Sequence, residues 1–471
     1  MARGKKKEHA LAPEEKLAQA LVPESEQPYP VPENWCWSYI SSGYEVASSK
    51  RVHKEDWLSE GIPFYRTREL VKLSDNGYVD NELFISEEQY ESFKSIYGVP
   101  QVDDLLISGV GTIGVPYIVN TEEKFYFKDG NVIWFKHRGL FVAKYIYFLY
   151  KSLFMDNQIH EMSSGTTVDT YTIVNANITK VPVPPLPEQQ RIVDRIESLF
   201  AKLDEAKQKA QTVLDSFETR KAAILHKAFT GELTAKWRAE HGVGMESWQS
   251  ETLQSVCSMK ITDGTHKTPT YCDSDIGVPF ISAKDVTGEA ICWDKIKYIV
   301  PELHEELYAR LAPQIDDVLL AKNGTTGVAA IVDVDKVFDL YVTLAVLRPD
   351  KQKILPRYLL RIVNSPICKD QFDEHLTGIG VPNLHLRDIK EVMIQVPSLG
   401  EQTEIVRILG SLFAKEQQAR EAAEAVLEQI DLLKKSILAR AFRGELGTND
   451  PSEESAVELV KRVLEKVSAN K

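Results

Sequence analysis

An internal repeat constrains this chain more than any other feature. Shifting the sequence by 213 positions aligns residues 183–233 with residues 396–446 without a gap, and 24 of the 51 aligned residues are identical. Unrelated segments would share only a handful, so the chain contains a duplicated unit. The repeat also extends towards the N-terminus, where it aligns Trp35 with Trp248, Asp103-Asp104 with Asp316-Asp317, Gly111-Thr112 with Gly324-Thr325, Gly114 with Gly327 and Tyr145 with Tyr358.

The closely repeated stretches have the pattern of long helices. Between Glu188 and Thr230 there is neither Gly nor Pro, and apolar residues recur mostly in alternating steps of four and three. This is a heptad seam, and Pro187 and Gly231 are suitable start and stop signals. A helix of about 42 residues is a rod of roughly 60 Å. We expect the two seams to pair within the chain, although a generic dimerisation helix is an alternative. The expected contact residues are Ile192, Leu199, Leu203, Val213 and Phe217 in the first copy and Ile405, Leu412, Val426, Ile430 and Ile437 in the second.

The stretch of about 150 residues before each helix shares only scattered identities with its counterpart. Alternating β-rich runs and short helical patterns predict a mixed α/β (α+β) fold for both stretches. We therefore expect two globular domains separated by two long helices, with an internal pseudo-two-fold repeat. The expected parts are a flexible N-terminal segment with a short helix (1–33), a first globular domain (34–181), a central region with a long helix (182–245), a second globular domain (246–395), a C-terminal region with a second long helix (396–447) and a helical tail (448–471).

Motifs for catalysis are either missing from the sequence or followed by residues that do not fit the fold that the motif requires. Gly109, Gly111 and Gly114 spell G-x-G-x-x-G, but another β-like run follows them, and Lys322 replaces the first glycine in the second copy. A helix N-terminus that could bind a dinucleotide is therefore not expected there, and a tight loop between two strands is. No G-x-x-x-x-G-K-[ST] motif exists for ATP phosphates, and the five cysteines form no C-x-x-C pair. We expect no catalytic residue, no metal and no cofactor in this chain.

The motif P-L-P-E-Q-x-x-I-V at residues 185–193, followed by a long helix that ends in F-T-G-E-L at residues 229–233, resembles Type I restriction-modification specificity subunits. The resemblance covers residues 35–446. It implies that each globular domain is a target recognition domain that reads one half of a bipartite, asymmetric DNA site. It also implies that the long helices form an antiparallel coiled coil that sets the distance between the halves.

The same resemblance places the chemistry in partners. Two methyltransferase subunits would methylate adenine with S-adenosylmethionine, and two restriction subunits would use ATP and Mg for translocation and cleavage. The chain itself would bind double-stranded DNA without acting on it. Its net charge of −13 is unusual for a DNA-binding protein, so either the positive charge gathers on one face of each domain or a partner supplies phosphate contacts.

Short polar turns, glycine loops and basic residues are the candidates for DNA contact, since hydroxyl and amide groups bind phosphates and arginine suits guanine. For each loop the competing interpretation is an ordinary structural turn or a solvated surface. The candidates are Lys50, Arg51, Arg66, Arg68, Ser108, Gly111, Thr112, Ser164 and Thr166 in the first domain, and Thr265, His266, Lys267, Lys284, Lys322, Asn323 and Thr325 in the second.

Two other classes of function compete with DNA reading. A self-contained enzyme would need a nucleotide or metal site, and none is found in the sequence. A coiled-coil scaffold with two protein-binding domains would explain the acidic balance, but it predicts binding that is insensitive to salt. A basic start without an apolar segment behind it, and apolar runs too short to cross a bilayer, predict a cytoplasmic protein.

Overall fold

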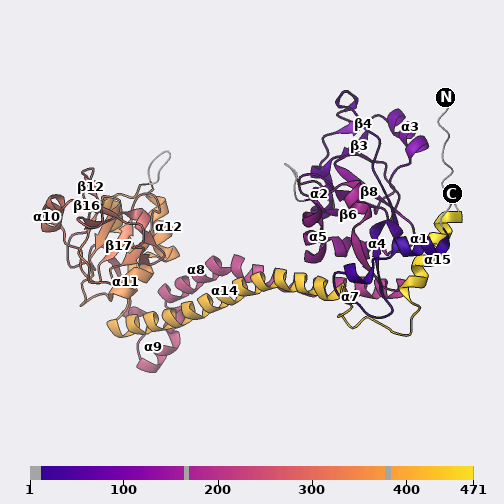
Figure 1. Ribbon diagram of the computed structural model, residues 1–471. Coiled ribbons are helices and arrows are strands. Elements are labelled where there is room, and N and C mark those ends of the chain that lie inside the picture. The colour runs from indigo at the N-terminus through magenta and orange to yellow at the C-terminus, as the bar shows by residue number, and fades with distance from the viewer. Residues whose placement is uncertain (1–11, 164–168, 377–382, 470–471) are drawn as a thin grey trace. The chain divides into compact units, whose positions relative to one another are not determined.

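The computed structural model describes residues 12–163, 169–376 and 383–469. The chain divides into two compact units. Unit 1 comprises residues 1–209 and 426–471, and unit 2 comprises residues 210–425. Each unit therefore combines one globular domain with parts of both long helices (Figure 1). Each unit contains residues from both copies of the repeat. The duplication in the sequence is therefore also visible in the structure.

Unit 1 is an α/β domain whose strands form three small sheets with the orders β2-β8-β5-β6, β4-β3-β7 and β1-β9. The strands are β1 (Cys36–Tyr39), β2 (Tyr44–Ala47), β3 (Ile62–Tyr65), β4 (Phe84–Ile85), β5 (Leu105–Ser108), β6 (Pro116–Ile118), β7 (Tyr126–Phe127), β8 (Val132–His137) and β9 (Lys180–Val183). The helices are α1 (Pro13–Ala20), α2 (Thr67–Asn76), α3 (Glu87–Tyr97), α4 (Ala143–Tyr150), α5 (Leu153–Ser163), α6 (Ile173–Asn177) and α15 (Ala456–Ala469), with most of α7 (Leu186–Asp215).

Unit 2 repeats this topology with the sheet orders β11-β20-β17-β18, β12-β16-β13-β19 and β10-β21, and adds the strand β12 and the hairpin β14-β15. The strands are β10 (Gln249–Thr252), β11 (Thr262–Asp263), β12 (Tyr271–Cys272), β13 (Val278–Ile281), β14 (Val286–Thr287), β15 (Ala290–Ile291), β16 (Lys297–Ile299), β17 (Val318–Ala321), β18 (Ala329–Ile331), β19 (Asp339–Leu340), β20 (Leu344–Leu347) and β21 (Met393–Val396). The helices are α8 (Phe217–Phe229), α9 (Ala235–His241), α10 (Pro301–Arg310), α11 (Pro356–Val363), α12 (Pro366–Glu374), α13 (Leu386–Glu391) and most of α14 (Leu399–Ala441).

The two domains share even the less common pairings. β3 runs parallel to β7 in unit 1, and β13 runs parallel to β19 in unit 2, whereas β5 and β17 each pair antiparallel with both neighbours. The expected mixed α/β fold of both domains is confirmed. Domains whose sequences differ at most positions have kept one topology.

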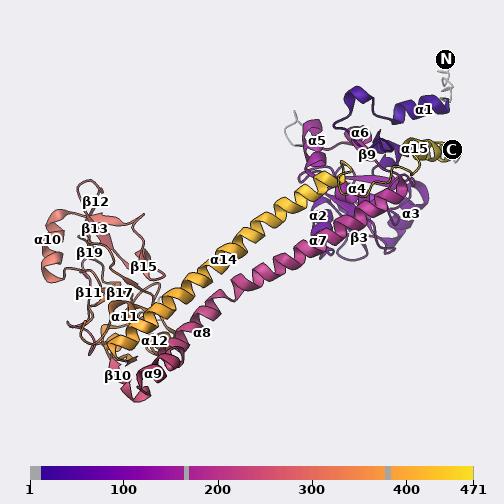
Figure 2. The ribbon, with the colours of Figure 1, turned by 90° about the horizontal axis from the view of Figure 1, so that it is seen from below.

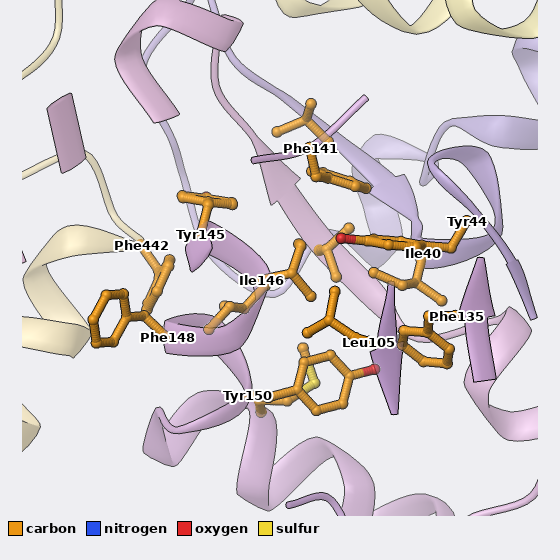
Figure 3. Packing of buried hydrophobic residues seen from close by; sticks show 14 of the residues in the cluster. Ile40, Tyr44, Leu105, Phe135, Phe141, Tyr145, Ile146, Phe148, Tyr150 and Phe442 are labelled. Carbon is orange, nitrogen blue, oxygen red and sulfur yellow. The ribbon is translucent and has the colours of Figure 1, made fainter. Parts of the chain in front are cut away.

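The core of each globular domain includes the end of a long helix. In unit 1 the ring of Phe442, the residue directly after α14, lies 5.3 Å from the ring of Tyr145 on α4 (Figure 3). In unit 2 the ring of Phe229, from α8, lies 5.3 Å from that of Tyr358 on α11. The hydroxyl groups of the two tyrosines donate to the carbonyls of Pro182 and Gln395, at 3.1 Å and 2.7 Å. Each domain thus holds the start of one long helix and the end of the other.

The helices pair antiparallel in both units. In unit 1 the Lys434 amine of α14 lies 2.6 Å from the Asp204 carboxylate of α7 and over the ring of Phe200. In unit 2 Arg220 of α8 binds Glu416 of α14 at 2.8 Å, and Arg420 lies over the ring of Phe217. The ribbons of α8 and α14 lie side by side (Figure 2). From the first ion pair to the second, the residue number rises from 204 to 220 on the first helix and falls from 434 to 416 on α14. The predicted antiparallel coiled coil is confirmed.

Two details of the helices differ from the sequence expectation. The first helix is interrupted at Ser216, whose hydroxyl donates to the carbonyl of Thr212 at 2.7 Å, a bond that bends helices. The expected contact residue Val426 is 39% exposed, because the seam of α14 passes through its neighbour Leu427. Long charged side chains such as Arg420 and Lys434 occupy seam positions of α14, so a search for apolar residues selects the wrong neighbours there.

Near the start of α7 and of α14, a buried glutamine side chain forms hydrogen bonds to the backbone of the globular domain. The side chain of Gln189 accepts from the Val142 N–H and donates to the carbonyls of Leu140 and Pro184, all within 3.1 Å. Gln402 bonds Leu355, Lys353 and Pro397 in the same way. The repeated glutamine of the P-E-Q motif therefore has a structural role.

We predict that Gln189→Leu destabilises unit 1, because it leaves buried backbone groups without partners. The cost is on the order of 3 kcal/mol, which corresponds to a fall of roughly 6–12 °C in the midpoint of that unit. Differential scanning calorimetry would measure it. The control is Gln190→Leu, since Gln190 is exposed and bonds only Asp194 of the same helix. Equal midpoints for both variants would contradict the role of Gln189.

Candidate nucleic-acid interface

A hollow of about 470 Å³ on unit 2 brings together several of the predicted residues. Lys284, Asn323 and Thr325 line it, although they come from two segments about 40 residues apart. The sequence analysis missed the aromatic part of its lining, which includes Tyr271, Phe280 and Tyr341, and also missed Lys297. Alternation in β12 and β16 could have indicated Tyr271 and Lys297, but strands of two and three residues give no readable pattern.

Exposed positive charge and an exposed aromatic ring meet at this hollow. The ring of Tyr271 is 45% exposed, and the Lys297 amine lies 4.2 Å from its centre. The Lys284 amine is half exposed and binds the Asp285 carboxylate at 2.5 Å. A hollow with aromatic walls and amines at its edge can accept a planar base and the phosphates beside it.

The repeated glycines of the β17-β18 and β5-β6 loops are required by the backbone. Gly324 and Gly111 have φ of +79° and +81°, in the left-handed region that side chains rarely adopt. In unit 1 the Ser108 hydroxyl is buried and donates to the carbonyl of Thr112 at 2.5 Å, which closes the loop on itself. Gly111 and Thr112 stay exposed at its tip. The β5-β6 loop therefore offers its tip, and not Ser108, to a ligand.

The segment 262–269 of unit 2 is divided between the interior and the surface. Asp263 and Thr265 are buried, and a side chain on Gly264 would lie 2.0 Å from the Leu340 carbonyl oxygen. The Lys322 amine is also buried and lies 2.6 Å from the Asp263 carboxylate. Lys322 therefore joins the β17-β18 loop to this segment and does not face a ligand.

His266 and Lys267, by contrast, are exposed. The His266 ring lies 3.3 Å from the Asp263 carboxylate, and the Lys267 amine binds Glu306 of α10 at 2.6 Å. The His266 ring and both members of the Lys267–Glu306 pair are exposed, and an exposed ion pair is weak and can exchange for a phosphate. These two side chains are the part of the segment that a ligand can reach.

The arginines of unit 1 are already held by carboxylates. Arg66 donates twice to Glu69, and Arg68 donates to Glu69 and Glu82, all within 3.0 Å. Burial raises the pKa of Glu69, but the hydrogen bonds from both arginines outweigh burial and lower it to about 2. Glu69 also accepts from the Arg66 N–H, as Asp285 does from the Ser282 N–H in unit 2. A base contact by either arginine would have to compete with a fully ionised neighbour.

The other candidates of unit 1 lie apart from these arginines in sequence. Lys50 and Arg51 are exposed, with the Lys50 amine 5.4 Å from the ring centre of Tyr97 and Arg51 bound to Asp129 at 3.0 Å. Ser164 and Thr166 lie outside the described residues. A hollow of about 480 Å³ between α3 and residues 121–125 includes none of the predicted residues. This hollow of unit 1 therefore does not correspond to the hollow of unit 2.

Metal and membrane sites were sought in the same ranges. Within residues 12–163, 169–376 and 383–469, no group of three or more His, Cys, Asp or Glu side chains could hold a metal ion. None of the helices described combines the length and the apolar character needed to cross a bilayer.

A comparison with known protein families identifies the family to which the chain belongs. The family model described as "Type I restriction modification DNA specificity domain" matches the chain twice, at residues 32–214 and 245–429. The two matches cover well over half of the chain and begin 213 residues apart. The chain belongs to the Type I restriction-modification specificity subunits. Each match starts just before a globular domain and ends within a long helix, so each contains one globular domain and the first part of the long helix that follows it.

Relatives and solved structures agree with this membership. The specificity subunit is 26% identical over 337 residues to the EcoKI specificity subunit of Escherichia coli K12, which covers 68% of this chain and 70% of the relative. It is 34% identical over 165 residues to a putative specificity subunit of Haemophilus influenzae. The crystal structure of the HsdS subunit from Thermoanaerobacter tengcongensis superposes with a TM-score of 0.62 at 18% identity, covering 90% of this chain and all of that one. The last comparison supports the fold.

For this specificity subunit we predict that Lys322→Met destabilises unit 2, because it leaves the buried carboxylate of Asp263 without its cation. The expected cost is about 3 kcal/mol, measured as a lower midpoint of thermal unfolding. Lys267→Met removes the amine of an exposed pair in the same domain, and its cost should be below about 1 kcal/mol. Similar midpoints for the two variants would show that the Lys322 pair contributes little.

Proposed function

We propose that this chain is the DNA-reading subunit of a Type I restriction-modification complex and that it carries out no chemistry itself. Each globular domain reads one half of a bipartite, asymmetric site in double-stranded DNA, and the coiled coil sets the spacing. Two methyltransferase subunits that bind S-adenosylmethionine modify adenine, and two restriction subunits that use ATP and Mg act on unmodified DNA. A complex of this kind acts in the cytoplasm.

One observation carries the proposal. A single topology occurs twice in the chain, with the same buried glutamate and glutamine at the start of each long helix and different residues at the corresponding surfaces. After β3 the chain has Arg66-Thr67-Arg68, and at the same point after β13 it has Ser282-Ala283-Lys284. Equal frames with different surfaces are what two readers of different sequences need.

The ion pairs between basic residues and carboxylates affect how strongly the chain alone can bind DNA. Arg66, Arg68 and Lys322 are bound to carboxylates, and the net charge of the chain is −13. Affinity for DNA grows with the number of phosphates that cations neutralise. We infer that the methyltransferase subunits supply much of the phosphate contact, so that the chain alone binds DNA weakly and the complex binds it strongly.

The alternative, a coiled-coil scaffold with two protein-binding domains, predicts no preference for a DNA sequence. Mapping of adenine methylation across the genome, with and without the gene for this chain, separates the two. A bipartite motif that disappears without the chain supports DNA reading. An unchanged set of methylated sites favours the scaffold.

Lengthening the coiled coil tests the spacing. Seven residues inserted in α7 after Lys209, together with seven in α14 after Ala425, keep the heptad pattern of both helices. The added length is about 10 Å, which is roughly three base pairs. We predict a motif with the same two halves and a spacer longer by about that amount. The control is a shuffled seven-residue insertion in the exposed turn at Gly77. An unchanged spacer would refute the role of the coiled coil as a ruler.

Exchange of the segment 246–395 for that of another specificity subunit tests modular reading. We predict that one half of the motif changes and that the other half and the spacer stay the same, since each globular domain has its own core. Methylation mapping measures the result. A change in both halves would contradict the assignment of one half-site to each domain.

A further inference from the structure

The turn of the β14-β15 hairpin has an unusual backbone. β14 and β15 pair Val286 with Ile291 and Thr287 with Ala290, which leaves Gly288 and Glu289 as a two-residue turn. Both turn residues have positive φ, +54° for Gly288 and +81° for Glu289. Turns of this type favour Asn, Asp and Gly, and a glutamate adopts this conformation at a cost. Something other than local preference must therefore hold Glu289 here.

The carboxylate of Glu289 has two cationic partners. The guanidinium of Arg361, on α11, lies 2.9 Å from one carboxylate oxygen and 2.8 Å from the other. The Lys221 amine, on α8, lies 4.0 Å from the carboxylate. The side chains of Glu289 and Arg361 are only 16% and 19% exposed, so this ion pair is partly shielded from water. These contacts compensate for the unfavourable backbone of the turn.

Both cations also touch the other long helix. The Arg361 guanidinium lies 4.6 Å from the ring centre of Phe413 on α14, and the Lys221 amine lies 5.7 Å from the same ring. The Glu289 carboxylate of the globular domain thus contacts Lys221 of α8 directly. It is linked to α14 indirectly, because both of its cationic partners lie over the ring of Phe413. We call Glu289, Arg361, Lys221 and Phe413 the ionic joint of unit 2.

Unit 1 has a different joint at the same place. The repeat offset aligns Arg361 with Phe148, Phe413 with Phe200 and Lys221 with Lys434. Phe148 and Phe200 pack edge to face with ring centres 5.9 Å apart, and the Lys434 amine lies over Phe200 and binds Asp204 within the coiled coil. Between β3 and β4, unit 1 has helix α2, whereas unit 2 has the β14-β15 hairpin between β13 and β16. The joint of unit 1 therefore combines this ring contact with an exposed ion pair, in which the Lys144 amine of α4 binds the Glu197 carboxylate of α7 at 2.7 Å. In unit 2 the carboxylate belongs to the globular domain, and its ion pair with Arg361 is largely shielded from water.

From this difference we infer that Glu289 is a positioning residue that holds the second reading domain in one orientation on α8 and α14, and so restricts the spacing at which its half-site is read. The inference rests on the proposed function. A shielded, directional ion pair fixes an orientation more tightly than a contact of two apolar rings beside an exposed ion pair. Loss of the carboxylate should leave the domain folded but less narrowly placed on its helices.

The test uses the complete complex with its methyltransferase subunits and three DNA duplexes. One duplex carries the mapped motif, and the others have one base pair more or one fewer between the half-sites. Glu289→Asn removes the carboxylate and suits the positive φ of the turn, so the hairpin should fold at least as well. We expect this variant to lower the preference for the natural spacing about fivefold, since coupled contacts of this kind affect binding to that extent.

Control and rescue variants separate positioning from stability. Lys351→Gln breaks an exposed ion pair of the same domain, with Asp316, in which neither residue belongs to a long helix, and it should leave the preference unchanged. The exchange Glu289→Arg with Arg361→Glu should restore much of the preference that Glu289→Asn loses. Arg361→Phe, which introduces the residue of unit 1, should lower the preference while the unfolding midpoint stays within a few degrees.

Three outcomes would overturn the inference. An unchanged preference in Glu289→Asn shows that the joint does not set spacing. An equal loss of affinity for all three duplexes shows that Glu289 only stabilises the domain. A wild-type complex that prefers no sequence at all removes the proposed function together with the role of Glu289, and it is recognised before any variant is made.

Discussion

The fold depends on a buried glutamate and glutamine at the start of each long helix. Glu188 accepts a bond of 2.7 Å from the indole N–H of Trp35, and Glu401 accepts one of 3.0 Å from that of Trp248. A carboxylate at a helix N-terminus is stabilised by the helix dipole, and the bond to tryptophan fixes the direction in which the helix leaves its domain. The neighbouring glutamines fix the same helices to backbone groups of the globular domains. The paired identities of the repeat therefore mark the places where helix and domain must not move.

The two copies complete this joint differently. In unit 2 the Glu401 carboxylate binds the guanidinium of Arg238 at 2.6 Å and the hydroxyl of Thr234. In unit 1 the remaining partners of Glu188 are the neutral side chains of Thr448 and Asn449. Burial raises the pKa of Glu188, and the bonds from Trp35, Asn449 and Thr448 only partly oppose this. One copy uses a buried ion pair where the other uses neutral donors, so the chain tolerates change around the carboxylate but keeps the carboxylate itself.

Sequence patterns predicted the architecture well because its signals are long. A heptad pattern sustained over some 40 residues and an offset that recurs along the chain cannot arise from local preference. The errors lie where chemistry departs from the pattern. Val426 was selected because it is apolar, yet the seam of α14 uses the stems of charged residues, and the break at Ser216 comes from one hydroxyl and from Arg220, which donates to the Val213 carbonyl at 3.3 Å. Such substitutions are invisible to a search for apolar periodicity.

The candidate contact residues were harder to predict, and the reason is physical. Asp263, Ser108 and Lys322 have the composition of a ligand-binding loop, but the structure uses them inside the protein to close loops. A polar residue in a turn satisfies backbone groups as readily as it binds a ligand, so sequence alone cannot separate the two roles. Tyr271 and Lys297 become adjacent only through the pairing of β12 with β16.

One frame can serve two different readers when different positions control recognition and placement. Some of the positions that the two copies share have an obligatory backbone or buried role, such as the left-handed Asp103 and Asp316 or the glycines that follow. The positions that differ include exposed loops and residues at the joints between domain and helix, such as Phe148 and Arg361. A change at an exposed loop alters which groups meet a ligand, whereas a change at a joint alters where the whole domain is held. Because the two kinds of position are separate in the fold, recognition and placement can vary independently while the buried glutamates keep both copies on one scaffold.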